Sequence, residues 1–150
     1  MLTRRTLIGL AAALPALGAT NLARAAEPRI YQRDGFALGG TDPVAYFRQG
    51  APVQGDPAVS HEWMGATWIF SGADNRDAFA AAPDRYAPAF GGYCAFAASR
   101  GYLAPTIPEA WHIHEDRLFL NATLRARTLW LAELPDVIAA GEANWPAILG

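Results

Sequence analysis

Few side chains in this chain are candidate metal ligands, and they are of the types that bind soft metal ions. There is one cysteine, Cys94, and three histidines, His61, His112 and His114, with Met64 close to the first of them. Thiolate, imidazole and thioether together suit copper, and thiolate with imidazole suits zinc. These five residues are therefore candidate metal ligands, with copper favoured and zinc as the second choice.

The histidine pair has a spacing that can bring two imidazoles together. His112 and His114 are two residues apart in a segment that reads as a strand, so their side chains are expected on one face. Two imidazoles on one face can share an ion. The alternative is that Trp111 and Ile113 face the core and leave both histidines in solvent. Solvent exposure is also the default expectation for His61.

Cys94 follows two glycines and a tyrosine, and glycines permit close approach of the backbone. A single cysteine cannot form an internal disulfide bond. It is a metal ligand, a reactive thiol, an intermolecular link, or a small buried residue packed among alanines and a phenylalanine. A thiol buried in apolar surroundings is inert.

The sequence contains none of the local motifs that mark common catalytic sites. It lacks a glycine-rich phosphate loop, a G-x-S-x-G elbow, a C-x-x-C pair and an H-E-x-x-H helix. A Cys–His nucleophile pair stays open, because its two members need only meet in space. These observations favour a protein that is not an enzyme.

The elements that must position these residues are short. Segments 59–64 and 66–70 read as strands joined at Gly65, and segments 111–114 and 117–121 read as a second hairpin. Segment 29–33 is expected to be an edge strand or tail, and segment 93–99, which carries Cys94, to be a short helix or strand.

Helices are expected between these hairpins. Asp42 is suited to cap a helix that begins at Pro43, and Ser71 to cap one that runs to about residue 82. Two more are expected at 122–131 and 135–143. The sequence thus predicts an α+β fold, a small single domain in which antiparallel hairpins are packed by short helices.

The N-terminal segment 1–25 has the features of an export signal. A basic start with Arg4 and Arg5 precedes an uncharged run over positions 7–19. This run is shorter than a spanning helix, which needs roughly 20 residues. Ala23-Arg24-Ala25 follows as an A-x-A cleavage site. We expect a signal of the twin-arginine type, cleavage near Ala25, a periplasmic domain over 26–150, and no stable membrane span afterwards.

Charge excludes one class of partner. The chain has 12 basic and 14 acidic residues, and every basic residue is an arginine. Removal of the signal takes away three arginines and no acid, so the mature domain is more negative. A negative domain without a basic run is unsuited to nucleic acid. A metal ion and a periplasmic protein remain the candidate partners.

Several motifs occur in a fixed order along nearly the whole mature chain. They are Asp-Pro-Val-Ala-Tyr-Phe at 42–47, Gly-Ala-Thr-Trp at 65–68 with Phe70, Asn75 and Phe79, Pro-Asp-Arg-Tyr-Ala-Pro at 83–88 leading to Gly-Gly-Tyr-Cys-Ala at 91–95, and shorter matches at 108–111, 118–121 and 144–146. Together they resemble the exported YHS-domain proteins of bacteria, from about Thr41 to Pro146.

The resemblance implies a small α+β module that binds metal. YHS domains occur alone or attached to copper-transporting ATPases and some hydroxylases. The attached forms often have more than one cysteine, whereas Cys94 stands alone here. Ile107 replaces the aspartate that usually precedes the Pro-Glu-Ala-Trp motif, and residues 114–117 replace an Asp-Gly hairpin tip. His112 and His114 are not motif positions, so a site built on them would be particular to this protein.

Three functions follow from these patterns. The first is a periplasmic, non-enzymatic domain that binds or senses a soft metal, copper above all, with Cys94 as main ligand and His61, Met64 or the His112/His114 pair beside it. The second is a protein-interaction or structural module with Cys94 buried. The third is a thiol enzyme or small-molecule binder that uses the loop 86–93. The exposure of Cys94 separates the three.

Overall fold

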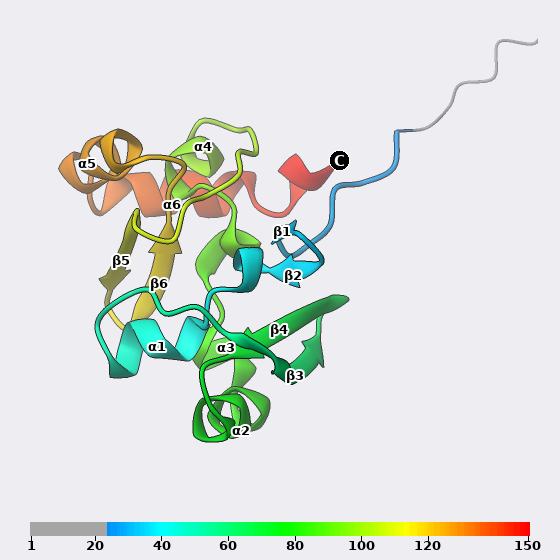
Figure 1. The fold of residues 1–150 in the computed structure, drawn as a ribbon. Coiled ribbons are helices and arrows are strands. Elements are labelled where there is room, and N and C mark those ends of the chain that lie inside the picture. The colour runs from blue at the N-terminus through cyan, green and yellow to red at the C-terminus, as the bar shows by residue number, and fades with distance from the viewer. Residues whose placement is uncertain (1–23) are drawn as a thin grey trace, which may run out of the picture.

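The computed structural model describes residues 24–150, and the predicted export signal lies almost wholly outside them. The described part contains six α-helices and three two-stranded antiparallel sheets, so the predicted α+β fold is confirmed (Figure 1). The strands are β1 (Gln32–Arg33), β2 (Phe36–Ala37), β3 (Asp56–Trp63), β4 (Ala66–Phe70), β5 (Trp111–His114) and β6 (Arg117–Leu120). The helices are α1 (Pro43–Arg48), α2 (Ala73–Ala81), α3 (Pro83–Tyr86), α4 (Ala95–Ser99), α5 (Leu124–Ala132) and α6 (Asp136–Asn144), with 3-10 turns η1 (Leu38–Gly40), η2 (Ala89–Gly92) and η3 (Ala147–Leu149).

The hydrophobic core has two parts, and β6 contributes to both. Leu118 and Leu120 belong to the cluster built around α1, α2 and β4, whereas Phe119 belongs to the cluster under α4, α5 and α6. Successive side chains of a strand point to opposite faces, so one short strand serves two cores. In Figure 1 the β5–β6 hairpin accordingly runs between the upper helices α4–α6 and the lower group α1–α3.

Aromatic rings fill both clusters. In the first, Trp68 and Phe79 are fully buried with their ring centroids 4.8 Å apart. In the second, the rings of Phe119 and Trp130 are also fully buried at a separation of 4.8 Å. Each ring buries about 150–250 Å² of apolar surface, so these pairs are major contributors to the stability of the two cores.

A buried carboxylate joins the lower elements to one another. Asp42 is fully buried, and its Oδ1 accepts hydrogen bonds from the backbone amides of Val44 and Ala45 at 2.9 and 3.2 Å. Its Oδ2 accepts from the amide and hydroxyl of Ser71 and from the side chain of Asn75, at 2.9, 2.8 and 2.8 Å. The predicted cap of α1 is confirmed, and the same residue also fixes the segment that leads into α2.

The structure corrects two of the predicted element boundaries. Ser71 is not the N-cap of α2, because Gly72 occupies that position and the Ser71 hydroxyl donates to Asp42 instead. The segment 29–33, predicted as an edge strand or a tail, is a strand only at β1, which pairs with the two residues of β2. Within residues 24–150, no helix combines the length and hydropathy that a membrane crossing needs.

Replacing Asp42 tests how much the fold depends on this carboxylate. The Asp42→Ala substitution leaves five donors without their acceptor at a buried position, and we expect it to lower the free energy of unfolding by about 4 kcal/mol. The matched control is Asp77→Ala, which removes an exposed carboxylate that pairs with Arg76 and should cost under about 1 kcal/mol. Urea unfolding of both variants measures the difference, and equal losses would contradict the assignment.

Candidate functional site

Cys94 is a helix cap inside the domain. It is 2 % exposed and is the N-cap of α4, where its Sγ accepts a hydrogen bond from the Ala97 amide at 3.4 Å. The thiol itself donates to Oδ1 of Asn121 at 3.6 Å. The backbone amide of Cys94 donates to the Ala104 carbonyl, and Cys94 forms a parallel bridge with Leu120 of β6. Backbone and thiol are thus both fixed.

Asn121 supports Cys94 from the end of β6. This residue is fully buried, and its Oδ1 also accepts from the Phe96 amide at 3.0 Å. One side-chain oxygen therefore serves the cysteine thiol and an orphan amide of the first turn of α4. Asn121 ends the Leu-Phe-Leu-Asn motif seen in the sequence, and only the fold brings it to Cys94. Its Nδ2 is buried without a partner among the described residues.

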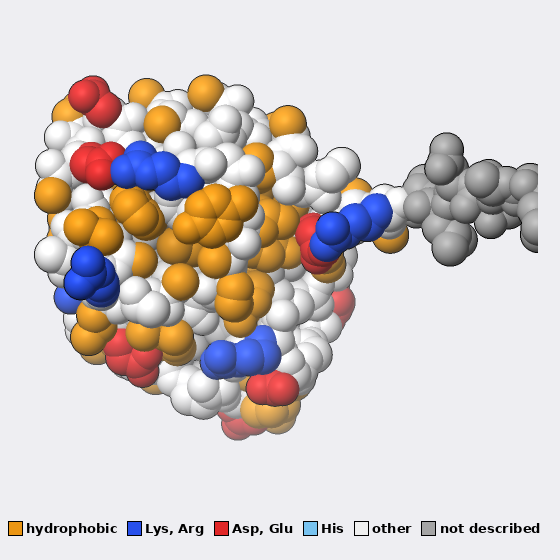
Figure 2. Space-filling view, turned by 90° about the horizontal axis from the view of Figure 1, so that it is seen from above, with side chains coloured by type: hydrophobic (Ala, Val, Ile, Leu, Met, Phe, Trp, Pro, Cys, Tyr) orange, Lys and Arg blue, Asp and Glu red, His pale blue; other side chains and the backbone are white. Residues whose placement is uncertain are grey.

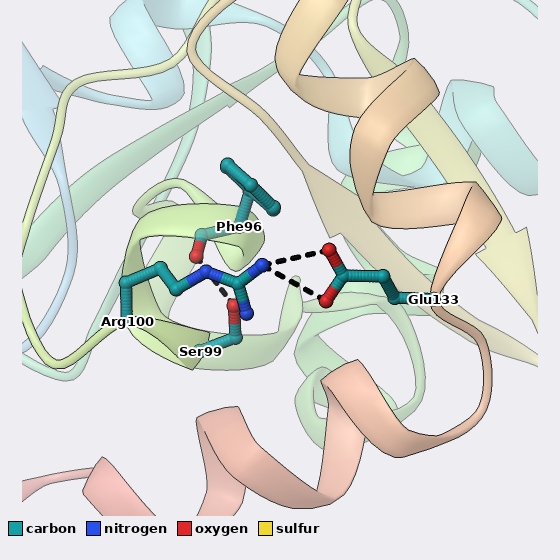
Figure 3. A network of polar contacts seen from close by, with 4 residues as sticks. All are labelled: Phe96, Ser99, Arg100 and Glu133. Atoms are coloured by element: carbon teal, nitrogen blue, oxygen red, sulfur yellow. Dashed lines mark hydrogen bonds and ion pairs between the residues drawn. The ribbon is translucent and has the colours of Figure 1, made fainter.

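The far end of α4 is attached to the upper helices. Arg100 donates through Nη2 to both carboxylate oxygens of Glu133, at 2.7 and 2.9 Å, and its guanidinium lies 4.7 Å from the centroid of the Phe96 ring (Figure 3). The Ser99 hydroxyl donates to the Phe96 carbonyl at 2.6 Å. The helix that Cys94 caps is thus held at both ends, which limits local opening around the thiol.

His112 and His114 do share a face of β5, as predicted. Their rings are stacked with centroids 6.5 Å apart and an angle of 28° between the planes. Both side chains are half-buried, and the His112 ring also packs edge-on against Trp130 at 6.0 Å. The alternative expectation holds for Trp111 and Ile113, which pack against the first core, but the two histidines are half-buried and not left in solvent.

The environment of His112 disfavours its protonated form. Burial lowers the pKa of His112 below the usual 6.5, and the neighbouring His114 and Arg127 lower it further. At neutral pH this imidazole is therefore uncharged, and neutral imidazole is the form that binds metal ions.

The other two candidate ligands lie elsewhere. His61 is on β3, where it faces Trp68 across the hairpin and packs against the Phe79 ring at 6.1 Å. Met64 is 45 % exposed at the tip between β3 and β4. Cys94 in turn lies along the edge of β6 opposite to β5, because β5 and Cys94 both pair with Leu120.

The five predicted ligands do not come together into one metal site. Within residues 24–150, no three His, Cys, Asp or Glu side chains are close enough together to hold one ion. Of the five candidates, the structure brings together His112 and His114. Binding of copper or zinc stays a prediction.

An open groove is the feature that the sequence did not indicate. It has a volume of about 700 Å³ and lies between the N-terminal segment, the loop 101–105 and the C-terminal turn η3. Tyr31, Tyr93 and Tyr102 line it, together with Leu103 and Leu149. Figure 2, which views the molecule from above, shows hydrophobic side chains gathered near the centre of that face.

Comparison with known proteins adds no relative: no family model, no curated protein and no solved structure matches this chain. Membership of the YHS family stays a prediction from the motifs.

The state of His112 can be measured by titration. Because its folded-state pKa is lowered, the unfolded chain binds this proton first as the pH falls through 6.5, and acidification lowers the free energy of unfolding. We expect the NMR signal of the His112 ring to titrate below pH 6.5, and the loss of stability between pH 7 and pH 5 to be smaller in His112→Gln. A midpoint at or above 6.5 would contradict the burial of this ring.

Proposed function

We propose that this protein is an exported, non-enzymatic binding module in which Cys94 is a core residue. The observation that carries the proposal is the placement of the thiol, which is 2 % exposed and engaged both as donor and as acceptor. A free cysteine in such a setting behaves as a small hydrophobic residue. Of the three functions that the sequence leaves open, the interaction or structural module fits this placement best.

The partners of the sulfur argue against a thiol enzyme. A nucleophilic cysteine needs an adjacent base and an approach for its substrate. The partners of Cys94 are the Ala97 amide and the amide oxygen of Asn121, and neither of these can take up the thiol proton. Burial also argues against Cys94 as the main metal ligand, because coordination would require the thiol to lose the proton that it donates to Asn121 and the ion to enter a site that is 2 % exposed.

Export is supported by the region around the expected cleavage site. Residues 24–29 are exposed, so a peptidase can reach the bond after Ala25. The first backbone contact beyond it is the hydrogen bond from the Glu27 amide to the Leu149 carbonyl at 2.8 Å. Cleavage after Ala25 would therefore keep this attachment, and it would remove Arg24 and Ala25 from the edge of the groove.

The tyrosine-lined groove is the surface through which we propose that the module engages a periplasmic protein. Tyr102 is 53 % exposed at the edge of this groove. Tyrosine contributes large contact area with a polar tip, which suits protein interfaces. An apolar segment of a partner protein is the chemistry that matches this lining.

Thiol labelling tests the role of Cys94. In the protein purified from the periplasm, we expect an alkylating reagent to modify Cys94 at least about 100-fold more slowly in the folded state than in denaturant, because modification requires local opening. Cys94→Ala should remain folded, and it provides the blank for the labelling. Rapid alkylation of the folded protein would overturn the proposal and favour the thiol enzyme.

Metal binding is a second candidate function, and the histidine pair is the observation that favours it. Two neighbouring imidazoles, of which His112 is neutral at neutral pH, form a partial site for Cu²⁺ or Zn²⁺. The ligands would be His112 and His114, on a surface apart from Cys94. Copper is favoured and zinc is the second choice, because a given set of imidazole ligands binds Cu²⁺ more tightly than Zn²⁺.

Metal titration of the protein and four single variants decides this candidate. We expect one Cu²⁺ per chain, with His112→Ala and His114→Ala each weakening the affinity by on the order of 10-fold or more, while His61→Ala and Cys94→Ser leave it unchanged. Absence of stoichiometric metal would rule out the site. A loss of binding in Cys94→Ser alone would instead restore the cysteine as the main ligand.

A further inference from the structure

A second hollow, distinct from the groove, lies where five separate segments of the chain meet. We call it the hairpin hollow. It is lined by the tips of the β3–β4 and β5–β6 hairpins, by α3 with the loop 87–91 that follows it, by the segment before β1 and by Trp145. Its volume is about 240 Å³, which corresponds to about eight water molecules and is below the range of drug-sized pockets.

The floor of the hairpin hollow is aromatic. Phe90 is buried, and Trp63 and Trp145 are half-buried beside it. Phe90 and Trp145 are in contact, with ring centroids 6.1 Å apart. Trp63 and Trp145 therefore offer the apolar surface to a small molecule, and Phe90, which is 5 % exposed, holds Trp145 in place through the ring contact.

The rim of the hollow carries opposite charges that do not neutralise one another. Arg29, Arg85, Asp84 and Asp116 line it, and none of them forms an ion pair with another residue of the described part. The fifth charged residue, Arg117, is already paired with a glutamate at 2.7 Å. Two guanidinium groups and two carboxylates therefore remain available at the edge of an aromatic surface.

Three residues with an unfavourable backbone conformation converge on this hollow. The φ angles are 52° at Met64, 55° at Phe90 and 60° at Asp116. These values lie in the left-handed region that non-glycine residues rarely adopt. Met64 and Asp116 stand in two-residue hairpin turns, which require this conformation and which readily accept aspartate. Phe90 is not at a hairpin tip, and such conformations outside tight turns cluster at binding sites.

We propose that the hairpin hollow binds a small zwitterionic molecule with an apolar body, of the size of a free amino acid. The apolar body lies against Trp63 and Trp145. The carboxylate of the ligand pairs with Arg29 and Arg85, and its ammonium pairs with Asp116. A ligand with only one charge would leave either the arginines or the aspartate without a partner.

Three probes with the same phenylethyl body test this proposal in the full chain. They are L-phenylalanine, 3-phenylpropionate, which lacks the ammonium, and 2-phenylethylamine, which lacks the carboxylate. By calorimetry we expect L-phenylalanine to bind at one site about tenfold more tightly than either analogue. Amide NMR shifts should change at the two hairpin tips and in the loop 87–91.

Charge variants test the two kinds of ion pair in the proposal. Arg85→Gln should weaken L-phenylalanine and 3-phenylpropionate and leave 2-phenylethylamine unchanged, whereas Asp116→Asn should weaken L-phenylalanine and 2-phenylethylamine only. Arg125→Gln and Asp77→Asn, which lie outside the hollow, are the matched controls and should change nothing. Equal affinity for the three probes, shifts centred elsewhere, or no binding of L-phenylalanine at millimolar concentration would overturn the proposal.

Discussion

The carboxylate of Asp42 is the interaction on which the lower half of the domain depends. It accepts hydrogen bonds from the start of α1 and from the Ser71 and Asn75 side chains on the way into α2, so it determines how two helices and the end of β4 are arranged. A buried carboxylate is tolerated only when its oxygens are satisfied, and here five donors satisfy them. The aromatic cluster around Phe79 can then pack against elements whose relative position is already fixed.

Much of this arrangement follows from local rules. The hairpin over β3 and β4 could be predicted from alternation around Gly65, and the cap at Asp42 from a short polar residue followed by Pro43. The second role of Asp42 could not be predicted. Ser71 looks like an ordinary helix cap by its position, and only the fold reveals that its hydroxyl is directed to a residue 29 positions away.

The candidate site was less predictable, because its residues meet across long stretches of sequence. The sequence identifies Cys94 as unusual, but its environment depends on Asn121, which is 27 positions away and carries no chemical signal of its own. The spacing of His112 and His114 correctly predicts a shared face. The sequence does not predict that His112 lies against Trp130 and is partly desolvated there. This contact forms only when α5 packs against β5. The hairpin hollow combines segments from the whole length of the domain, and no local pattern marks it.

The position of β6 between the two cores has a consequence for the order of folding. Neither cluster is complete without residues 117–120, which come late in the chain, so the preceding elements lack part of their packing surface until this strand has been synthesised. Local hairpins and helices can form earlier, but they cannot reach the native packing density. The first cluster should therefore become complete when β6 is in place, and the second only when α5 and α6 have followed it. Because both clusters share this strand, the two halves should unfold as one cooperative unit.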